Sequence, residues 1–160
     1  MARVLIVPCG ARGQALAREL RAAGHAVRGT TRSAAHTAAI AETGAEPYVG
    51  DPDRIATLME ALHGVTIVCW LMGTVPDPDL HAGRLRMLWE KLVDTPVRGV
   101  VYEAAGTLED EVLAGGVELA RRAHDTWQIP LAVLDTDPSE CERWRADALS
   151  AVQQLLGWTV

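Results

Sequence analysis

The sequence predicts an α/β fold in one domain over residues 1–160, built on a doubly wound parallel sheet of about six strands. Short apolar runs alternate with longer amphipathic segments, and Gly, Pro or Asp stands at most of the joints. The run at 65–71 is apolar without alternation, which is typical of a strand covered on both faces of its sheet. A chain of this length can also bury a sizeable core.

Each expected strand is followed by an expected helix. Apolar runs predict strands at 3–7, 26–31, 46–49, 65–71, 98–103 and 130–135. Apolar residues at helical spacing predict helices at 12–23, 34–43, 53–62, 79–93, 109–125 and 139–156. This alternation predicts parallel strands with helices on both faces of the sheet.

Residues with known conformational preferences mark several element ends. Gly24 stands where the first helix should stop, because glycine adopts the left-handed conformation at little cost. Ser33 can cap the second helix, and Asp51 followed by Pro52 is typical of the start of the third. The longest expected loop, 72–80, follows the fourth strand at the sheet edge where ligands bind in such folds.

Composition and charge narrow the class of protein. A formal net charge of -6 argues against nucleic acid and against an anionic membrane as partners. The apolar run at 4–7 is too short for a signal peptide, and no stretch approaches the ~20 residues that span a bilayer. Cys9, Cys69 and Cys141 match neither a disulfide framework nor a CxxC metal site. We therefore expect a cytoplasmic protein in which Cys9 and Cys69 are buried as small hydrophobes.

The segment 3–16 is the most informative, because a strand leads through a tight glycine turn directly into a helix. Gly10 would let the main chain approach a pyrophosphate, and Gly13 would let the helix pack close to the strand. Amides at the helix start would then face the phosphates, helped by the helix dipole. This Rossmann-type arrangement predicts a dinucleotide site. The alternative is a tight turn that binds nothing.

The glycine turn departs from the usual pattern at one position. Pro8 replaces the first glycine of G-x-G-x-x-G, and proline alters the backbone geometry there. In the G-x-x-G-x-x-G pattern, Gly10 and Gly13 match and Leu16 replaces the last glycine. Two of three glycines remain in either alignment.

The end of the second strand distinguishes the cofactors. An NAD site usually has an acidic residue about 20 residues after the turn, and no carboxylate is present in 28–33. Thr31, Arg32 and Ser33 suit a 2′-phosphate instead, and Arg12 in the turn could reach the same phosphate. We therefore expect NADP(H), with NAD the less favoured cofactor. The alternative for Arg32 is a solvated surface side chain.

These residues, from 10–13 through 23–27 to Thr31 and Arg32, resemble the atypical or extended short-chain dehydrogenases. The nearest resemblance is to small NAD-dependent-epimerase-like and nitrogen-repressor-like NAD(P)-binding proteins. In that family an Asp after the third strand contacts the adenine amino group, which the resemblance assigns to Asp51; a helix cap is the alternative. The full set expected to bind cofactor is Gly10, Ala11, Arg12, Gly13, Thr31, Arg32, Ser33, Asp51, Leu71 and Met72.

The catalytic residues of that family are missing. Active members use Tyr-x-x-x-Lys, but Tyr48 and Tyr102 are followed four residues later by Pro and Gly, and Lys91 is preceded four residues earlier by Met. Ala104 and Ala105 occupy the place of the usual serine hydroxyls after the fifth strand. Standard short-chain dehydrogenase chemistry is therefore not expected.

Glu103 is the remaining catalytic candidate, at the carboxyl end of a central strand close to where a nicotinamide would lie. Burial there would raise its pKa and suit it to act as a general acid or base. The alternative is that Glu103 accepts backbone hydrogen bonds. Asp135 and Asp137 end the sixth strand and could approach the same crevice, although Asp137 would also serve as a cap.

The histidines and tryptophans carry weaker signals. Metal-ligand spacing is lacking among the five histidines, for which we expect surface or turn positions: His25, His36, His63, His81 and His124. We expect no metal site. Core packing is the main role expected of four tryptophans: Trp89, Trp127, Trp144 and Trp158. Some of them, with the helical face at 81–92, would otherwise serve a homodimer interface.

Three hypotheses of function follow. The first is a non-standard NADP(H)-binding protein that senses the cofactor or reduces a small-molecule substrate by another route. The second is an oxidoreductase in which Glu103 acts as acid or base and the cofactor transfers hydride. The third is a scaffold or regulatory subunit with a vestigial cofactor site, because fold alone does not decide function.

Overall fold

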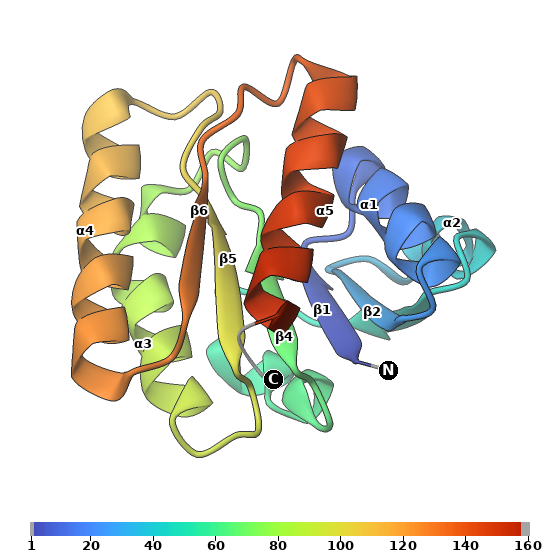
Figure 1. The fold of residues 1–160 in the computed structure, drawn as a ribbon, viewed down its shortest axis with the longest axis horizontal. Coiled ribbons are helices and arrows are strands. Elements are labelled where there is room, and N and C mark those ends of the chain that lie inside the picture. The colour runs from blue at the N-terminus through green and yellow to red at the C-terminus, as the bar shows by residue number, and fades with distance from the viewer. Residues whose placement is uncertain (1, 158–160) are drawn as a thin grey trace.

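A sheet of parallel strands forms the centre of the molecule, in a computed structural model that describes residues 2–157 (Figure 1). Within that range the sheet has six strands in the order β3-β2-β1-β4-β5-β6. The strands are β1 (Arg3–Val7), β2 (Ala26–Thr31), β3 (Glu46–Val49), β4 (Ile67–Trp70), β5 (Gly99–Glu103) and β6 (Leu131–Leu134). This order and the parallel pairing are those of a doubly wound Rossmann sheet, so the predicted fold class is confirmed.

Helices cover both faces of the sheet, as Figure 1 shows. The α-helices are α1 (Ala11–Ala22), α2 (Thr37–Glu42), α3 (Gly83–Leu92), α4 (Asp110–Trp127) and α5 (Cys141–Gly157). Helices α3 and α4 pack together on one face, and α1 and α5 pack together on the other. The 3-10 helices are η1 (Ala34–His36), η2 (Ile55–Leu58), η3 (Glu60–Leu62) and η4 (Pro78–His81).

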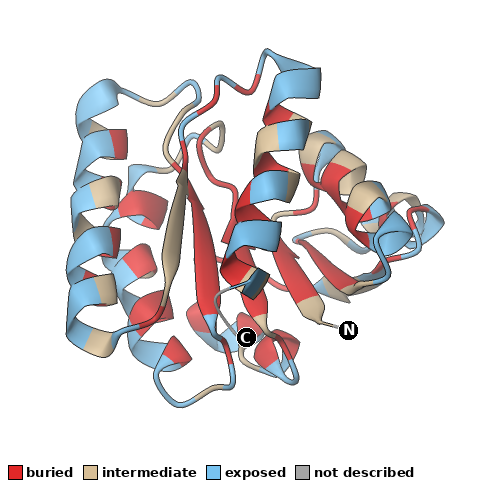
Figure 2. Ribbon diagram, viewed as in Figure 1, coloured by how far each residue is buried: buried red, intermediate tan, exposed pale blue. Residues whose placement is uncertain are grey.

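Alternation along the strands divides the core into two halves. Leu5 and Val7 of β1 belong to the half that packs on α3 and α4. Val4 and Ile6 of the same strand belong to the half that packs on α1 and α5. Because successive side chains point to opposite faces, a strand buried on both faces must be apolar there, as residues 4–7 of β1 are. Figure 2 shows these buried strands between helices whose outer faces are exposed.

The expected helix at 53–62 is wrong, because this segment forms the short 3-10 helices η2 and η3. Side chains form hydrogen bonds with the backbone groups that a helix would use. The Asp51 carboxylate accepts a hydrogen bond from Asp53 N at 2.9 Å, so Asp51 closes a turn instead of capping a helix. The Thr57 hydroxyl accepts from Asp51 N and donates to the carbonyls of Asp51 and Arg54. Such side-chain hydrogen bonds compete with a helical backbone.

Two other expected helices begin as 3-10 turns. The segment expected at 34–43 is η1 followed by α2, and Ser33 caps η1 by accepting from Ala35 N at 3.2 Å. The segment expected at 79–93 is η4 followed by α3, with a break at Ala82, whose φ and ψ are -133° and -105°. Gly24 follows α1 with φ +94°, the left-handed conformation that its position predicts.

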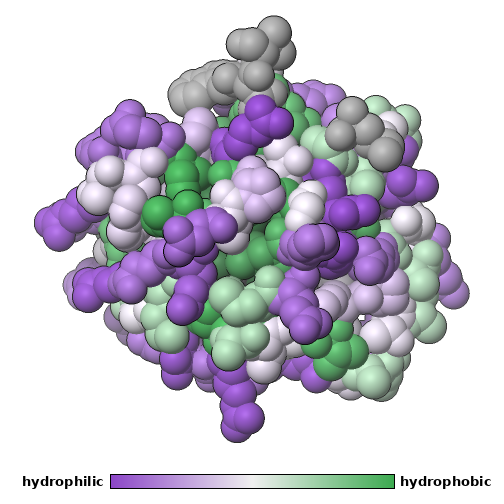
Figure 3. Space-filling model, turned by 90° about the horizontal axis from the view of Figure 1, so that it is seen from below, coloured by the Kyte–Doolittle hydropathy of each residue, from purple (hydrophilic) through white to green (hydrophobic). Residues whose placement is uncertain are grey.

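The carboxyl ends of the strands form one edge of the sheet, and the amino ends form the opposite edge. Figure 3 views the molecule from below, where apolar side chains lie among hydrophilic ones. A shallow open groove at this amino-terminal edge includes Arg28, whose guanidinium donates to the carbonyls of Ala61 and His63. No helix within 2–157 is long and apolar enough to cross a membrane.

Candidate functional site

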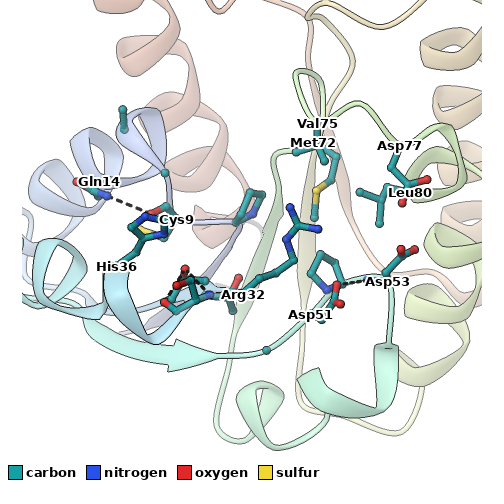
Figure 4. Close-up of a pocket in the computed structure, with 18 of the residues that line it drawn as sticks. Cys9, Gln14, Arg32, His36, Asp51, Asp53, Met72, Val75, Asp77 and Leu80 are labelled. Atoms are coloured by element: carbon teal, nitrogen blue, oxygen red, sulfur yellow. Dashed lines mark hydrogen bonds between the residues drawn. The ribbon is translucent and has the colours of Figure 1, made fainter.

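A cavity of about 480 Å³ opens at the carboxyl ends of β1, β2, β3 and β4 (Figure 4). Seven of the ten residues expected to bind cofactor line it: Gly10, Ala11, Thr31, Arg32, Ser33, Asp51 and Met72. The other three, Arg12, Gly13 and Leu71, line a smaller cavity of about 250 Å³ that shares Gly10 and Ala11 with the first. The fold therefore brings together at one edge residues that are far apart in the sequence.

The glycine turn has the packing that its sequence predicts. A Cβ placed on Gly13 would lie 3.0 Å from Ile6 Cγ2 and 3.1 Å from Pro8 O, so a glycine lets α1 approach β1. A Cβ on Gly10 would meet nothing within 4 Å, since Gly10 faces the open cavity. Gly10 precedes α1 and offers no side chain to cap it. The first backbone amides of α1 therefore have no side-chain cap, and such amides are suited to bind an anion.

The end of β2 presents hydroxyls and a guanidinium to the cavity. Thr31 Oγ1 accepts from Ser33 N at 3.2 Å, which fixes the turn that carries Arg32. Figure 4 shows the exposed Arg32 side chain reaching across the cavity toward Met72. Arg32 is the only lysine or arginine among the described residues that line this cavity.

Sequence reasoning missed Thr30, which precedes these residues on β2. Its side chain is 1% exposed and lines the cavity, yet its buried hydroxyl has no hydrogen-bond partner within the described chain. A buried hydroxyl without a partner costs free energy unless a ligand or water satisfies it. No local pattern marked Thr30, because threonine is common in strands.

The structure gives Arg12 partners other than the expected 2′-phosphate. Its guanidinium forms an ion pair with Glu103, with 2.7 Å between Nη2 and Oε1. Arg12 Nη1 donates to Thr74 Oγ1 at 3.1 Å, and the guanidinium carbon lies 5.2 Å from the centre of the Trp144 ring. A buried carboxylate and an aromatic face attract the guanidinium away from the cavity.

Glu103 is fully buried at the end of β5 and is enclosed by donors. Oε1 accepts from Gly73 N at 2.8 Å as well as from Arg12, and Oε2 accepts from the Trp144 indole at 2.8 Å. Burial raises the pKa of Glu103, as expected, while the Arg12 charge and these hydrogen bonds offset part of the rise. A role as acid or base stays a prediction, and the geometry argues against it because donors surround both oxygens.

Carboxylates lie along the opposite wall of the cavity. Asp51 keeps its other carboxylate oxygen, Oδ2, outside its turn, since Asp53 N donates to Oδ1. Asp53 pairs with Arg84, with 3.4 Å between Oδ1 and Nε, and Arg84 also pairs with Asp79 at 3.3 Å. Arg84 therefore balances the charge of Asp53 and ties the β3 loop to α3.

The expected surface position of His81 is wrong. His81 is 2% exposed, and its Nδ1 lies 2.5 Å from the Tyr102 hydroxyl while Nε2 lies 2.9 Å from the Met72 carbonyl. Burial lowers the pKa of His81, and burial also raises that of Tyr102. Since Met72 lines the cavity, this network holds one wall in place.

The cysteines and tryptophans mainly serve the core, as expected. Cys9 and Cys69 are buried, and burial raises the pKa of each thiol to about 12. Trp89 and Trp144 are buried, and Trp127 is half-buried against the core. Trp158 lies outside the described residues.

Comparisons with known proteins agree with this geometry. A family model described as NAD(P)H-binding matches residues 9–125. No curated protein sequence matches the chain. Triphenylmethane reductase from Citrobacter sp., solved in complex with NADP(H), is similar with a TM-score of 0.67 at 19% identity, over 85% of this chain and 49% of the reductase.

Two further solved structures are similar. An NADPH-dependent quinone oxidoreductase from Escherichia coli has a TM-score of 0.61 at 17% identity, over 84% of this chain and 46% of its own. A short-chain dehydrogenase/reductase superfamily protein from Agrobacterium tumefaciens with bound NAD has a TM-score of 0.63 at 19% identity, over 82% of this chain and 47% of its own. The chain spans about half the length of these proteins. At sequence identities this low, the structural similarity shows a shared fold and nothing more. The family match shows that the chain belongs to the NAD(P)H-binding family, and the solved structures share its fold.

Proposed function

Because the chain belongs to the NAD(P)H-binding family, we propose that its larger cavity binds NADP(H) in preference to NAD(H). The observation that supports this preference is the end of β2, where Thr31, Arg32 and Ser33 border the cavity and no carboxylate is present at 28–33. A guanidinium with neighbouring hydroxyls suits a phosphate dianion, whereas ribose hydroxyls are usually held by an acid at this place.

The residues present fit the other parts of such a cofactor. The exposed turn at Gly10 and Ala11, with the uncapped start of α1, suits the diphosphate. Asp51 has a carboxylate oxygen to accept from the adenine amino group, and the Thr30 hydroxyl offers a polar group that needs a partner. When bound, the cofactor would supply or accept hydride. Leu71 and Met72 would pack along it from the β4 end.

We assign the chain a role as a cofactor sensor or a non-standard reductase of a small molecule. The tyrosine–lysine pair of active short-chain dehydrogenases is missing, and Tyr102 is buried against His81. A scaffold that binds partners through tryptophans is less well supported, because Trp70, Trp89 and Trp144 are buried in the core.

The experiment is a calorimetric titration of the protein with NADP+, NADPH, NAD+ and NADH, repeated on Arg32→Ala. We expect both phosphorylated cofactors to bind more tightly than their counterparts. Loss of a charge-assisted contact should weaken NADP+ binding about tenfold, near 1.5 kcal/mol, and leave NAD+ affinity unchanged.

Arg121→Ala is the matched control, since Arg121 is exposed on α4 away from the cavity. It should leave all four affinities unchanged. Equal affinities for NADP+ and NAD+ would remove the assignment of the 2′-phosphate site. No binding of any of the four at millimolar concentration would refute the proposed function.

The homodimer and the cytoplasmic location stay predictions. A groove of about 340 Å³ runs between α3 and α4 and is lined by both Trp89 and Trp127. Sedimentation equilibrium of the wild type and of Trp127→Ala would show whether two copies associate and whether this groove takes part.

A further inference from the structure

The two halves of the sheet edge differ in how far they are open. In a Rossmann fold each half of the sheet serves one mononucleotide. The half formed by β1, β2 and β3 ends in the cavity of about 480 Å³, which the loop after β4 borders on its other side. The half formed by β4, β5 and β6 ends where Arg12, Glu103 and Trp144 are in contact, and it would receive the nicotinamide.

Arg12, Glu103 and Trp144, which we call the plug, fill that second half at the end of β5, beside the cavity of about 250 Å³ at the end of β4. The plug joins three separate elements: α1, the end of β5 and α5. Each of its members contacts the other two, through the ion pair at 2.7 Å, the indole hydrogen bond at 2.8 Å and the guanidinium 5.2 Å from the ring centre. Glu103 and Trp144 are 0% and 1% exposed.

The loops after β4 and β5 seal the plug from the side. Thr107 N donates to Gly73 O at 2.9 Å, and a Cβ on Gly106 would lie 1.9 Å from that same carbonyl oxygen. The two backbones are therefore in direct contact. Gly73 N donates to Glu103 at 2.8 Å, and Thr74 accepts from Arg12 at 3.1 Å, so the β4 loop is tied to the plug.

We infer that this site recognises its ligand by the 2′-phosphorylated adenosine diphosphate end alone, and that the plug keeps the nicotinamide ring in solvent. This inference rests on the proposed function, because it assumes that the cavity binds NADP(H). It assigns the binding free energy to groups that 2′-phospho-ADP-ribose shares with the cofactor. It also assigns to Arg12 a positioning role in excluding the ring, in place of a role in phosphate binding.

The test compares NADP+ with 2′-phospho-ADP-ribose, which is NADP+ without its nicotinamide. Calorimetry on the wild-type chain should give dissociation constants within about twofold of each other, and nicotinamide mononucleotide should not bind. The fluorescence of the reduced nicotinamide in NADPH should keep its intensity and wavelength on binding, because the ring stays in water.

A variant tests the plug directly. Arg12→Ala should open the second half, so that NADP+ gains at least about threefold in affinity over 2′-phospho-ADP-ribose and the NADPH emission rises. Arg12→Met keeps most of the side-chain volume and should change this ratio less. A thermal melt of each variant confirms folding.

The outcomes separate the two proposals. If neither NADP+ nor 2′-phospho-ADP-ribose binds, the proposed function fails. If both bind but wild-type NADP+ binds more than about tenfold more tightly and NADPH emission rises, the cavity is confirmed and the inference about the plug is overturned.

Discussion

Gly116 of α4 is the position where one added methyl group should disturb both the core and the candidate site. A Cβ on Gly116 would lie 1.8 Å from the Tyr102 hydroxyl and 2.6 Å from its ring carbon, so the ring must move. The Tyr102 hydroxyl contacts His81, and His81 contacts the Met72 carbonyl at the cavity wall. The strain of Gly116→Ala therefore reaches Met72 through two hydrogen bonds.

The magnitude follows from three contributions. Helix propensity favours alanine over glycine by about 1 kcal/mol. Overpacking a filled core costs about 1–3 kcal/mol. Separating Tyr102 from His81 would leave buried polar groups unsatisfied at about 1–3 kcal/mol. We expect a net destabilisation of about 1–5 kcal/mol, with weaker NADP+ binding because Met72 shifts.

Gly115, the neighbouring residue, is the matched control. A Cβ there would meet nothing within 4 Å, so Gly115→Ala should stabilise the chain by about 0.5–1 kcal/mol. Urea unfolding followed by circular dichroism gives both free energies. The two variants should differ in sign, and equal effects would refute the packing of Tyr102 against Gly116.

Three further predictions concern buried groups. Burial lowers the pKa of His81 below its ordinary 6.5, so the unfolded chain binds a proton that the folded chain does not. The free energy of unfolding should therefore fall as the pH falls below about 6.5, more steeply in the wild type than in His81→Gln. Burial raises the pKa of Cys9 and Cys69 to about 12, so a thiol reagent should modify only Cys141 in the folded chain and all three in urea. Glu103→Ala removes the acceptor of three hydrogen-bond donors and should cost about 3–5 kcal/mol in urea unfolding; a loss below about 1 kcal/mol would contradict the buried ion pair.

The sequence pattern predicted those parts of the fold that depend on residues close together in the chain. The bounds of β1, β2 and β3 agree with the predicted bounds. In β1 the run at 4–7 is apolar because the strand is buried on both faces of the sheet. The segment at 53–62 has helical spacing of apolar residues, yet the Asp51 and Thr57 side chains bind the backbone and prevent a helix. Spacing alone does not show that competition.

In the candidate site too, the sequence could place some residues and could not place others. Gly10, Thr31 and Arg32 could be placed from the order of strand, turn and helix, because parallel strands bring their carboxyl ends to one edge. The ion pair of Arg12 with Glu103 joins residues 91 positions apart, and no local pattern relates them. His81 could not be placed in the core from the sequence either, because its partner Tyr102 lies 21 residues away on another element.

The plug also bears on whether this chain can perform hydride chemistry. Breaking a buried ion pair costs about 3–5 kcal/mol, and Arg12, with 24% of its side chain exposed, belongs at the lower end of that range. A cost of about 3 kcal/mol lowers affinity on the order of a hundredfold. A nicotinamide ring can enter beside Glu103 only when this ion pair breaks, which costs that free energy. The phosphorylated adenosine end binds without breaking the pair. Reduction by way of Glu103 therefore requires that a substrate or partner first separate Glu103 from Arg12.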